Sequence, residues 1–303
     1  MVAWTYQRNG RVPDGAALPA GMRRFAAVVE YDGSDHPGWQ RQAHCAGIQQ
    51  WVETALSRVG DEAIAVVCAG RTDAGVHATA QVIHFDSRAA RSPRNWQCGA
   101  NANLPASIRL QWVDEIQPSF HARFSALART YRYVVHDAAT DPALLRAFSC
   151  RERRSLDIEA MRTAARALIG EHDFSAFRAA GCQSPTPLRY LSDLQIWRQG
   201  SLVVMEVTAN AFLLHMVRNL AGTLLAVGRG ERPPQWLAEL LASRQRTLGA
   251  ATAPAQGLYL VGVHYPPAFV VPALVGGPCF LSAAAPHPVT APLWQRPAVK
   301  RPQ

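Results

Sequence analysis

The densest group of chemically reactive side chains lies in the segment Gly70–Ala78, which reads GRTDAGVHA. Its acid, Asp73, stands between Gly70 and Gly75, which permit tight backbone turns. A carboxylate displayed in this way can act as a nucleophile or as a general base. Arg71 could hold a phosphate or pair with a base. On composition alone, however, Asp between glycines is more often a simple turn residue.

Strand-prone runs on both sides of this segment indicate how Asp73 is presented. Ile64–Ala69 and Ala80–Phe85 are rich in β-branched and aromatic residues, so the acid is expected at a strand-to-strand connection. Upstream, Arg24–Tyr31 predicts another strand, which ends in an Asp-Gly turn.

Four segments have apolar residues at helical spacing. In the first, Trp51 falls on the apolar face, and Gly60 stands where a C-terminal cap belongs. The predicted helices are Ile48–Val59, Leu156–Gly170, Leu213–Val227 and Gln235–Ser243.

Five further runs are typical of β-strands, and two of them are expected to form a hairpin joined through Gln199 and Gly200. These strands are Ile108–Ile116, Thr130–His136, Ser192–Arg198, Leu202–Thr208 and Leu258–His264. Interleaved helices with hairpins and long turns favour a mainly antiparallel sheet over a doubly wound parallel one. The predicted fold class is therefore α+β.

The order of these elements predicts two similar α/β subdomains, 24–117 with the Asp73 loop and 118–266. Residues 1–23 lack an apolar run long enough for a signal sequence or a membrane span, so we expect a flexible extension. The tail at 267–303 is rich in Pro and Ala and is expected to be irregular or disordered.

The composition favours a polyanionic partner and gives no sign of a metal site. The formal charge is +9 and the pI is about 9.7, as expected for a protein that binds nucleic acid. Because Lys300 is the only lysine, a codon bias toward Arg explains the charge equally well. The six cysteines form no C-x-x-C pair, which predicts a reduced, cytoplasmic and metal-free protein.

Taken in full, the segment Gly70–Ala78 resembles the signature loop of the tRNA pseudouridine synthases of the bacterial A class. The resemblance extends in order and spacing over about residues 24–266. The other matching segments are Tyr31–Gly33, Gly38–Gln42, Asn101–Pro105, Phe120–Phe124, Tyr131–Tyr133, Asn210–Phe212 and His215–Asn219.

This resemblance implies a homodimeric enzyme that converts uridine to pseudouridine at positions 38, 39 and 40 of the tRNA anticodon stem-loop. It implies two subdomains whose sheets join around a central basic cleft, and neither cofactor nor metal. Asp73 is then the catalytic carboxylate, Arg71 holds open the space left by the extruded base, and Tyr131 lines the pocket. Arg218 pairs with Asp73 and keeps it ionised.

The residue types suit this chemistry. The reaction breaks the bond between the ribose and N1, turns the base, and rejoins it through C5. A carboxylate can attack the sugar, attack the base or remove a sugar proton, and the sequence leaves these routes open. The stacked target must first be flipped out, which an inserted Arg71 side chain and a stacking Tyr131 ring would assist.

The resemblance also implies two RNA-contact segments. They consist of Phe120, His121, Ala122, Arg123 and Phe124, and of Gly181, Cys182, Gln183 and Ser184. Two positions depart from the family pattern. Pro185 stands where an Arg is frequent, which removes a possible phosphate contact, and Leu214 stands where some relatives have a second His.

Some of these residues also have simpler structural interpretations. Without the family match, Tyr131 would be a packed strand aromatic and Arg218 a solvated helix residue. His77, His121 and His215 are expected to be structural hydrogen-bond partners or RNA contacts. An inactive tRNA-binding protein of the same fold is the main alternative. A zinc deaminase is disfavoured because the H-x-E and P-C-x-x-C pattern is missing.

Overall fold

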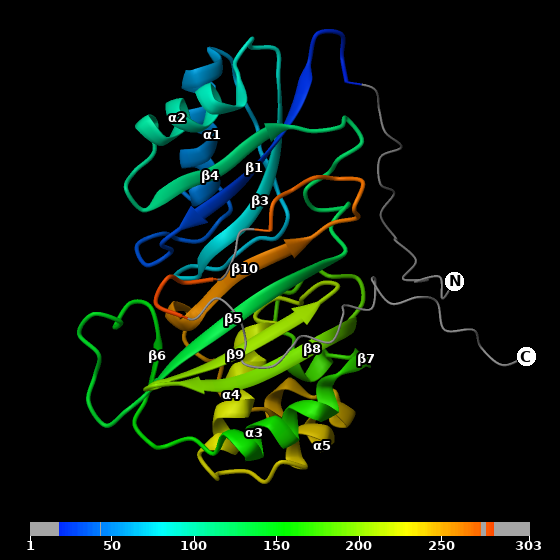
Figure 1. The fold of residues 1–303 in the computed structure, drawn as a ribbon. Helices are drawn as coiled ribbons and strands as arrows, with labels where there is room; N and C mark the ends of the chain where they lie inside the picture. Colours follow the sequence, from blue (N-terminus) through cyan, green and yellow to red (C-terminus); the bar gives the residue numbers. More distant parts are fainter. Residues whose placement is uncertain (1–17, 43, 274–276, 282–303) are drawn as a thin grey trace, which may run out of the picture.

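The computed structural model describes residues 18–42, 44–273 and 277–281. Most of the predicted extension at 1–23 and much of the tail at 267–303 lie outside these ranges. Within them, a single large sheet runs through the molecule (Figure 1). Its strands are β1 (Arg23–Tyr31), β2 (Val67–Cys68), β3 (His77–Ser87), β4 (Ile108–Glu115), β5 (Ala128–Asp137), β6 (Cys150–Glu152), β7 (Gly170–Asp173), β8 (Leu188–Gln199), β9 (Leu202–Ala209) and β10 (Leu258–His264).

The strand order is β4-β1-β3-β10-β5-β9-β8-β7, with β2 on β3 and β6 on β5. All pairings described are antiparallel except β10 with β3 and β6 with β5. The predicted α+β class with a mainly antiparallel sheet is therefore confirmed. The last strand, β10, lies between β3 of the first half and β5 of the second, so the C-terminal end of the fold joins the two halves.

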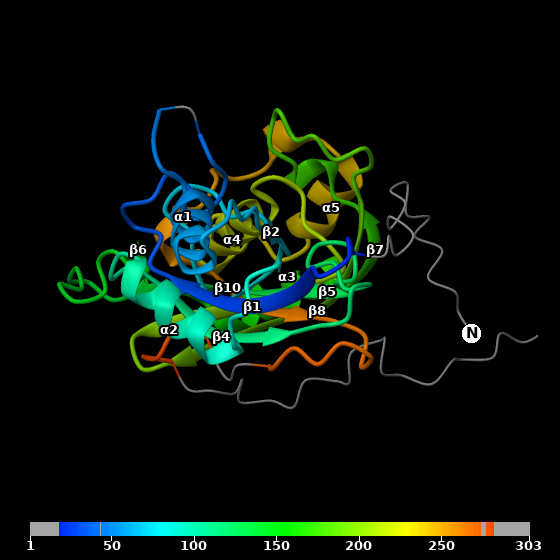
Figure 2. The same cartoon turned by 90° about the horizontal axis from the view of Figure 1, so that it is seen from above.

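The helices are α1 (Ile48–Gly60), α2 (Pro93–Asn103), α3 (Ile158–Ala165), α4 (Met216–Gly228) and α5 (Trp236–Ser243). Viewed from above, α1, α4 and α5 lie on one side of the sheet, and the chain that follows β10 lies on the other (Figure 2). The division at 118 falls in the connection between β4 and β5. One hydrophobic cluster contains Tyr31 of the first half and Leu224 of the second, so the two halves share part of their core. The division into two subdomains stays a prediction.

The sheet is covered on both faces, so side chains of its central strands are buried on either side, including polar ones such as Gln81 of β3 and Arg129 of β5. In β1, Phe25, Ala27 and Val29 point into the cluster beneath the helices, whereas Ala26 and Val28 point into a cluster on the opposite face. This alternation is the two-residue period of a strand.

The chain after β10 covers part of that opposite face. Phe269 packs against Phe120, and Leu281 packs in a cluster with Trp197 and Tyr259. The described part of the expected tail is therefore without helix or strand, as its composition suggested, and yet contributes side chains to the packing of the sheet.

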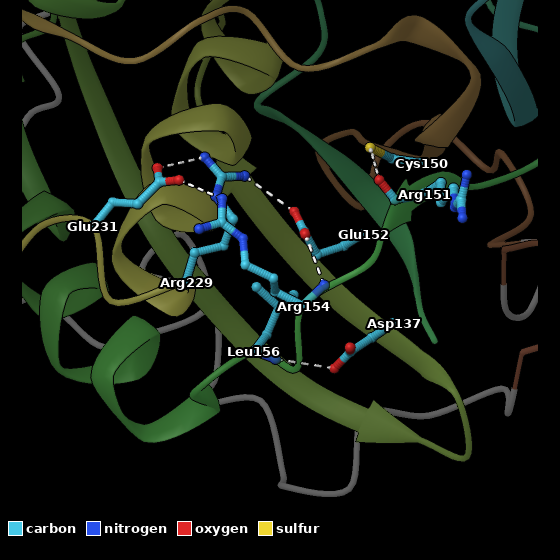
Figure 3. A network of polar contacts seen from close by, with 8 residues as sticks. All are labelled: Asp137, Cys150, Arg151, Glu152, Arg154, Leu156, Arg229 and Glu231. Carbon is cyan, nitrogen blue, oxygen red and sulfur yellow. Dashed lines mark hydrogen bonds and ion pairs between the residues drawn. The ribbon is translucent and has the colours of Figure 1, made fainter. Parts of the chain in front are cut away.

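Helix α4 is anchored at its C-terminal end by a network of charged side chains (Figure 3). Arg229, just after the helix, donates to Glu152 of β6 at 3.1 Å and to Glu231 at 2.9 Å. Arg154 also pairs with Glu231. Hydrogen bonds from Arg229 and Arg154 lower the pKa of Glu231 to about 2. The network ties α4 to the edge of the sheet.

Helix α2 was not predicted. It begins with Pro93 and is capped by Ser92, whose side chain accepts a hydrogen bond from Asn95. Only Trp96 and Ala100 of this helix are buried. Two buried residues do not make the apolar stripe by which a helix is recognised in a sequence.

Two predicted helix ends were also wrong. The helix predicted over Leu156–Gly170 ends at Ala165, because a short 3-10 turn follows and Gly170, at φ 115°, already begins β7, which pairs with β8. Gly60 is the last residue of α1, and Asp61 takes the left-handed cap. Trp51 is 40% exposed, since its position lies at the edge of the buried stripe of α1.

Candidate active site

Asp73 lies in the connection between β2 and β3, as predicted, and the backbone around it is held from outside the connection. Trp39 donates its backbone N–H to the carbonyl of Thr72 at 3.0 Å. Gly75 donates to the carbonyl of His36 at 3.3 Å. Backbone hydrogen bonds on both sides of Asp73 therefore fix the position of its carboxylate relative to the chain that follows β1.

Two glycines of that chain allow the close approach. Gly38 has a φ of 104°, and a Cβ there would come within 2.8 Å of the carbonyl oxygen of Thr72. A Cβ at Gly33 would overlap with the carbonyl of Val76. A side chain at either position would push the chain away from the Asp73 connection.

Buried polar side chains support the connection from below. The hydroxyl of Tyr31 lies 2.8 Å from Thr72 Oγ1, and Gln81 donates to the carbonyl of Gly70 at 2.5 Å. Gln81 also donates to the Tyr31 hydroxyl at 3.4 Å. Burial raises the pKa of Tyr31, so its hydroxyl stays protonated and shares a hydrogen bond with the Thr72 hydroxyl.

The Asp73 carboxylate faces the N-terminal turn of α4. Its Oδ2 lies 3.6 Å from an Arg218 guanidinium nitrogen and 3.4 Å from His215 Nε2. The side chain of Asp73 is 28% exposed, that of Arg218 17% and that of His215 34%. Arg218 is held in turn by Ala253, whose carbonyl accepts from its Nε at 2.8 Å. The expected pair between Asp73 and Arg218 is present.

Tyr131 of β5 lies next to the same group. Its ring packs edge-to-face against Phe212 at 5.1 Å, and its hydroxyl is close to Gly70, where a Cβ would be 3.6 Å away. Burial raises the pKa of Tyr131, and the negative charge of Asp73 raises it further. The structure thus brings Asp73, Tyr131 and Arg218 together from three elements that are distant in sequence.

Several arginines surround the start of the connection. Burial raises the pKa of the Cys68 thiol to about 11, although the positive charges of Arg71, Arg123 and Arg129 act to lower it. Arg71 and Arg123 are exposed, whereas Arg129 is buried. The two exposed guanidinium groups place positive charge near Cys68, at the start of the connection that carries Asp73.

The segment 120–124 is only partly available to a ligand. Phe120 and Ala122 are fully buried, because their side chains pack into the sheet, and RNA contacts of this segment stay a prediction. His121 and Phe124 are partly exposed and Arg123 is exposed, with its guanidinium 5.6 Å from the Phe124 ring centroid.

Arg129 fixes this segment to the connection that carries Asp73. Its guanidinium donates to the carbonyl of Ala69 at 2.9 Å and to that of Arg123 at 2.7 Å. It also donates to the carbonyl of Asn210 at 3.0 Å. Sequence reasoning missed this residue, because a buried arginine in a strand has no local signature.

The second expected RNA-contact segment, Gly181–Ser184, lies beside the start of α4. Arg178 donates to the carbonyls of Cys182 at 2.6 Å and Ser184 at 2.8 Å, which fixes the shape of the turn. The backbone N–H of Leu214 donates to Cys182 Sγ at 3.4 Å. Gly181, Gln183 and Pro185 are exposed.

The three histidines have different roles. His77 is structural: its Nδ1 accepts from Gly33 N–H at 3.1 Å, and its Nε2 lies 3.1 Å from the carbonyl of Ala147. His121 Nδ1 accepts from the backbone of Phe124 at 3.1 Å. His215 contacts Asp73, and this contact was not predicted. The spacing of three residues between His215 and Arg218, which places both side chains on one side of a helical turn, is the signal that could have indicated it.

Within the described ranges, no group of three or more His, Cys, Asp or Glu side chains is arranged to hold a metal ion. None of the described helices is long and apolar enough to cross a membrane.

The fold and the site define an α+β protein with one carboxylate held by a guanidinium and an imidazole beside a buried tyrosine. The family described as tRNA pseudouridine synthase matches residues 27–125 and 164–266. The chain belongs to the tRNA pseudouridine synthase family.

Curated relatives named tRNA pseudouridine synthase A include one from Alcanivorax borkumensis, 49% identical over 86% of this chain and 98% of the relative. The relative from Klebsiella pneumoniae is 51% identical over 86% of this chain and 96% of its own length. The relative from Legionella pneumophila is 53% identical over 85% of this chain and 98% of its own length. The solved archaeal box H/ACA sRNP Nop10–Cbf5 complex aligns at 10% identity and a TM-score of 0.30, over 78% of this chain and 57% of that one, which is too weak to support an argument.

A pH dependence of stability follows from His84, which lies beneath the segment 120–124. Its Nδ1 accepts from the backbone N–H of Ala122 at 3.1 Å, and burial lowers its pKa from 6.5 to about 3. The unfolded chain therefore binds this proton at a higher pH than the folded one. The contribution of His84 to stability is complete above pH 6.5 and is lost as the pH falls toward 3.

We expect His84→Gln, which keeps an acceptor for Ala122, to reduce the fall in unfolding temperature between pH 7 and pH 5 by roughly 2 °C. Thermal unfolding monitored by circular dichroism would measure it. His44→Gln, at an exposed position, is the matched control and should leave the slope as in the wild type. An unchanged slope in His84→Gln would contradict the assignment.

Proposed function

We propose that this protein converts uridine to pseudouridine at positions 38, 39 and 40 of the tRNA anticodon stem-loop, with Asp73 as the catalytic carboxylate. The observation that supports this most is the position of the Asp73 side chain, which is partly exposed, paired with Arg218 and next to Tyr131. Family membership supports the reaction type and the tRNA substrate. Such a substrate favours a cytoplasmic protein.

The roles of the three residues follow from their surroundings. Arg218 lies beside the Asp73 carboxylate and orients it for attack on the nucleotide or for proton removal. Burial keeps Tyr131 protonated and its ring packs against Phe212, and we assign this ring the role of packing against a flipped uracil. After C5 joins the ribose, the proton on C5 leaves and N1 gains one, so the isomerisation needs no redox partner.

Arg71 has the exposure and location to enter the stack when the base leaves it. It is two residues before Asp73 in the same connection, and its side chain is exposed. A planar guanidinium can stack in place of a base and can contact the flanking phosphate. We assign it the role of holding open the vacated space.

The Asp73 assignment predicts a loss of chemistry without a loss of binding. Asp73→Asn keeps the size of the side chain but removes the charge, so conversion in an unmodified tRNA transcript should fall below detection while the Kd for tRNA changes by less than about threefold. Tritium release from C5-labelled uridine would measure conversion, in transcripts with uridine at only one of the three positions. The assay should proceed in EDTA.

Asp61→Asn is the matched control, because Asp61 is an exposed helix cap and Asn also accepts its left-handed conformation. Conversion by Asp73→Asn would exclude its catalytic role. A wild-type protein that binds tRNA without converting uridine would instead support the inactive tRNA-binding alternative.

For RNA binding, we propose contacts from His121, Arg123 and Phe124, and from the segment Gly181–Ser184. Arg123 is exposed beside Phe124, so it can meet a phosphate while the neighbouring ring meets a base.

Arg123→Gln should weaken tRNA binding and lower the slope of log K against log salt by about one, as expected for one lost phosphate contact. Fluorescence anisotropy at several salt concentrations would measure the slope. Arg153→Gln, an exposed arginine beyond β6, is the control. Equal slopes in the wild type and Arg123→Gln would remove Arg123 from the interface.

We also propose that the protein acts as a homodimer, which rests on the family resemblance. Light scattering coupled to size-exclusion chromatography should give about twice the chain mass of 33.0 kDa. A mass equal to one chain at micromolar concentration would contradict the dimer.

A further inference from the structure

The backbone of His215 is unusual for its place in the fold. Its φ of 57° and ψ of 8° lie in the left-handed region, immediately before α4 begins. The other described non-glycine residues with positive φ, Asp61 and Arg244, are helix C-caps whose N–H groups bond back to the last turn. Left-handed residues are common at helix ends but costly for side chains elsewhere. His215 begins a helix, so helix termination does not explain its conformation.

The imidazole of His215 also does not serve the helix. A residue at the N-cap usually accepts a hydrogen bond from the first turn with its side chain, but α4 has no side-chain cap. The ring instead places Nε2 at 3.4 Å from Asp73 Oδ2. The strained backbone thus turns this side chain away from its own helix and toward the carboxylate.

Two donors converge on one oxygen of Asp73. His215 Nε2 and the Arg218 guanidinium both approach Oδ2, from the same turn of α4. A single contact would leave the carboxylate able to rotate about its Cβ–Cγ bond, whereas two contacts restrict that rotation.

We infer that His215 is a positioning residue, which together with Arg218 holds the Asp73 carboxylate in one orientation toward the nucleotide. This inference rests on the proposed function of Asp73. It gives His215 a role in the reaction that the resemblance to the family does not assign. Arg218 supplies charge, and His215 supplies the second point of attachment.

Neighbouring contacts keep the strained residue in place. Leu214, just before His215, donates its N–H to Cys182 Sγ at 3.4 Å and accepts from Ala179 N–H at 3.1 Å. Asn219 donates to the carbonyl of His215 at 2.9 Å. A residue in a sparsely populated conformation persists only where its surroundings fix it from several sides, and such residues are concentrated at functional sites.

The test separates the imidazole from the backbone. His215→Gly adopts a φ of 57° without strain, so it should fold, and it removes only the ring. We expect the single-turnover rate of uridine conversion to fall about 10²-fold, the loss typical of a misplaced reacting group, with the Kd for tRNA within twofold of wild type. Free imidazole in the buffer should restore part of the rate in this variant and none in Asp73→Asn.

His215→Asn, which also tolerates a positive φ but is too short to reach Oδ2, should show the same loss. Arg244→Gly is the matched control, since it relieves a φ of 57° far from Asp73 and should convert uridine at the wild-type rate. A wild-type rate in His215→Gly, or a loss confined to tRNA binding, would overturn the inference. Absence of conversion by the wild-type protein would instead refute the proposed function.

Discussion

The contact between the Asp73 carboxylate and the first turn of α4 is the interaction on which the site depends. It joins the connection between β2 and β3 to a helix that is far away in sequence, and it brings a negative charge to two donors. The relative placement of the two halves of the sheet therefore determines the position of the acid.

The rest of the fold keeps this contact in register. On one side, Gly33 and Gly38 let the chain after β1 lie directly against the Asp73 connection. On the other, α4 is buried along almost its whole length and its C-terminal end is tied to β6 through Arg229 and Glu152. Strand β10 completes the sheet between the halves. Both partners of the contact are thus held by rigid elements, which suits a site that must position reacting groups closely.

Helices and strands with a strong local sequence pattern could be predicted, whereas those with a weak pattern could not. Strands β1, β4 and β10 were predicted almost to their ends, because buried β-branched runs bounded by turns have few alternatives. Helix α2 was missed, since only Trp96 and Ala100 face the core. Phe120 and Ala122 belong to the same sequence motif as the exposed Arg123. Only the packing of the sheet shows that their two side chains point inward.

By itself, the sequence determined the fold class, the family and the candidate acid, because strand and helix periods and motif spacing are local properties of the chain. The structure alone decided which side chains meet. His215 and Arg218 converge on one oxygen of Asp73, and Arg129 joins three segments, through contacts between residues far apart in sequence. Such contacts depend on strand order and on the left-handed backbone before α4, and no local pattern encodes either.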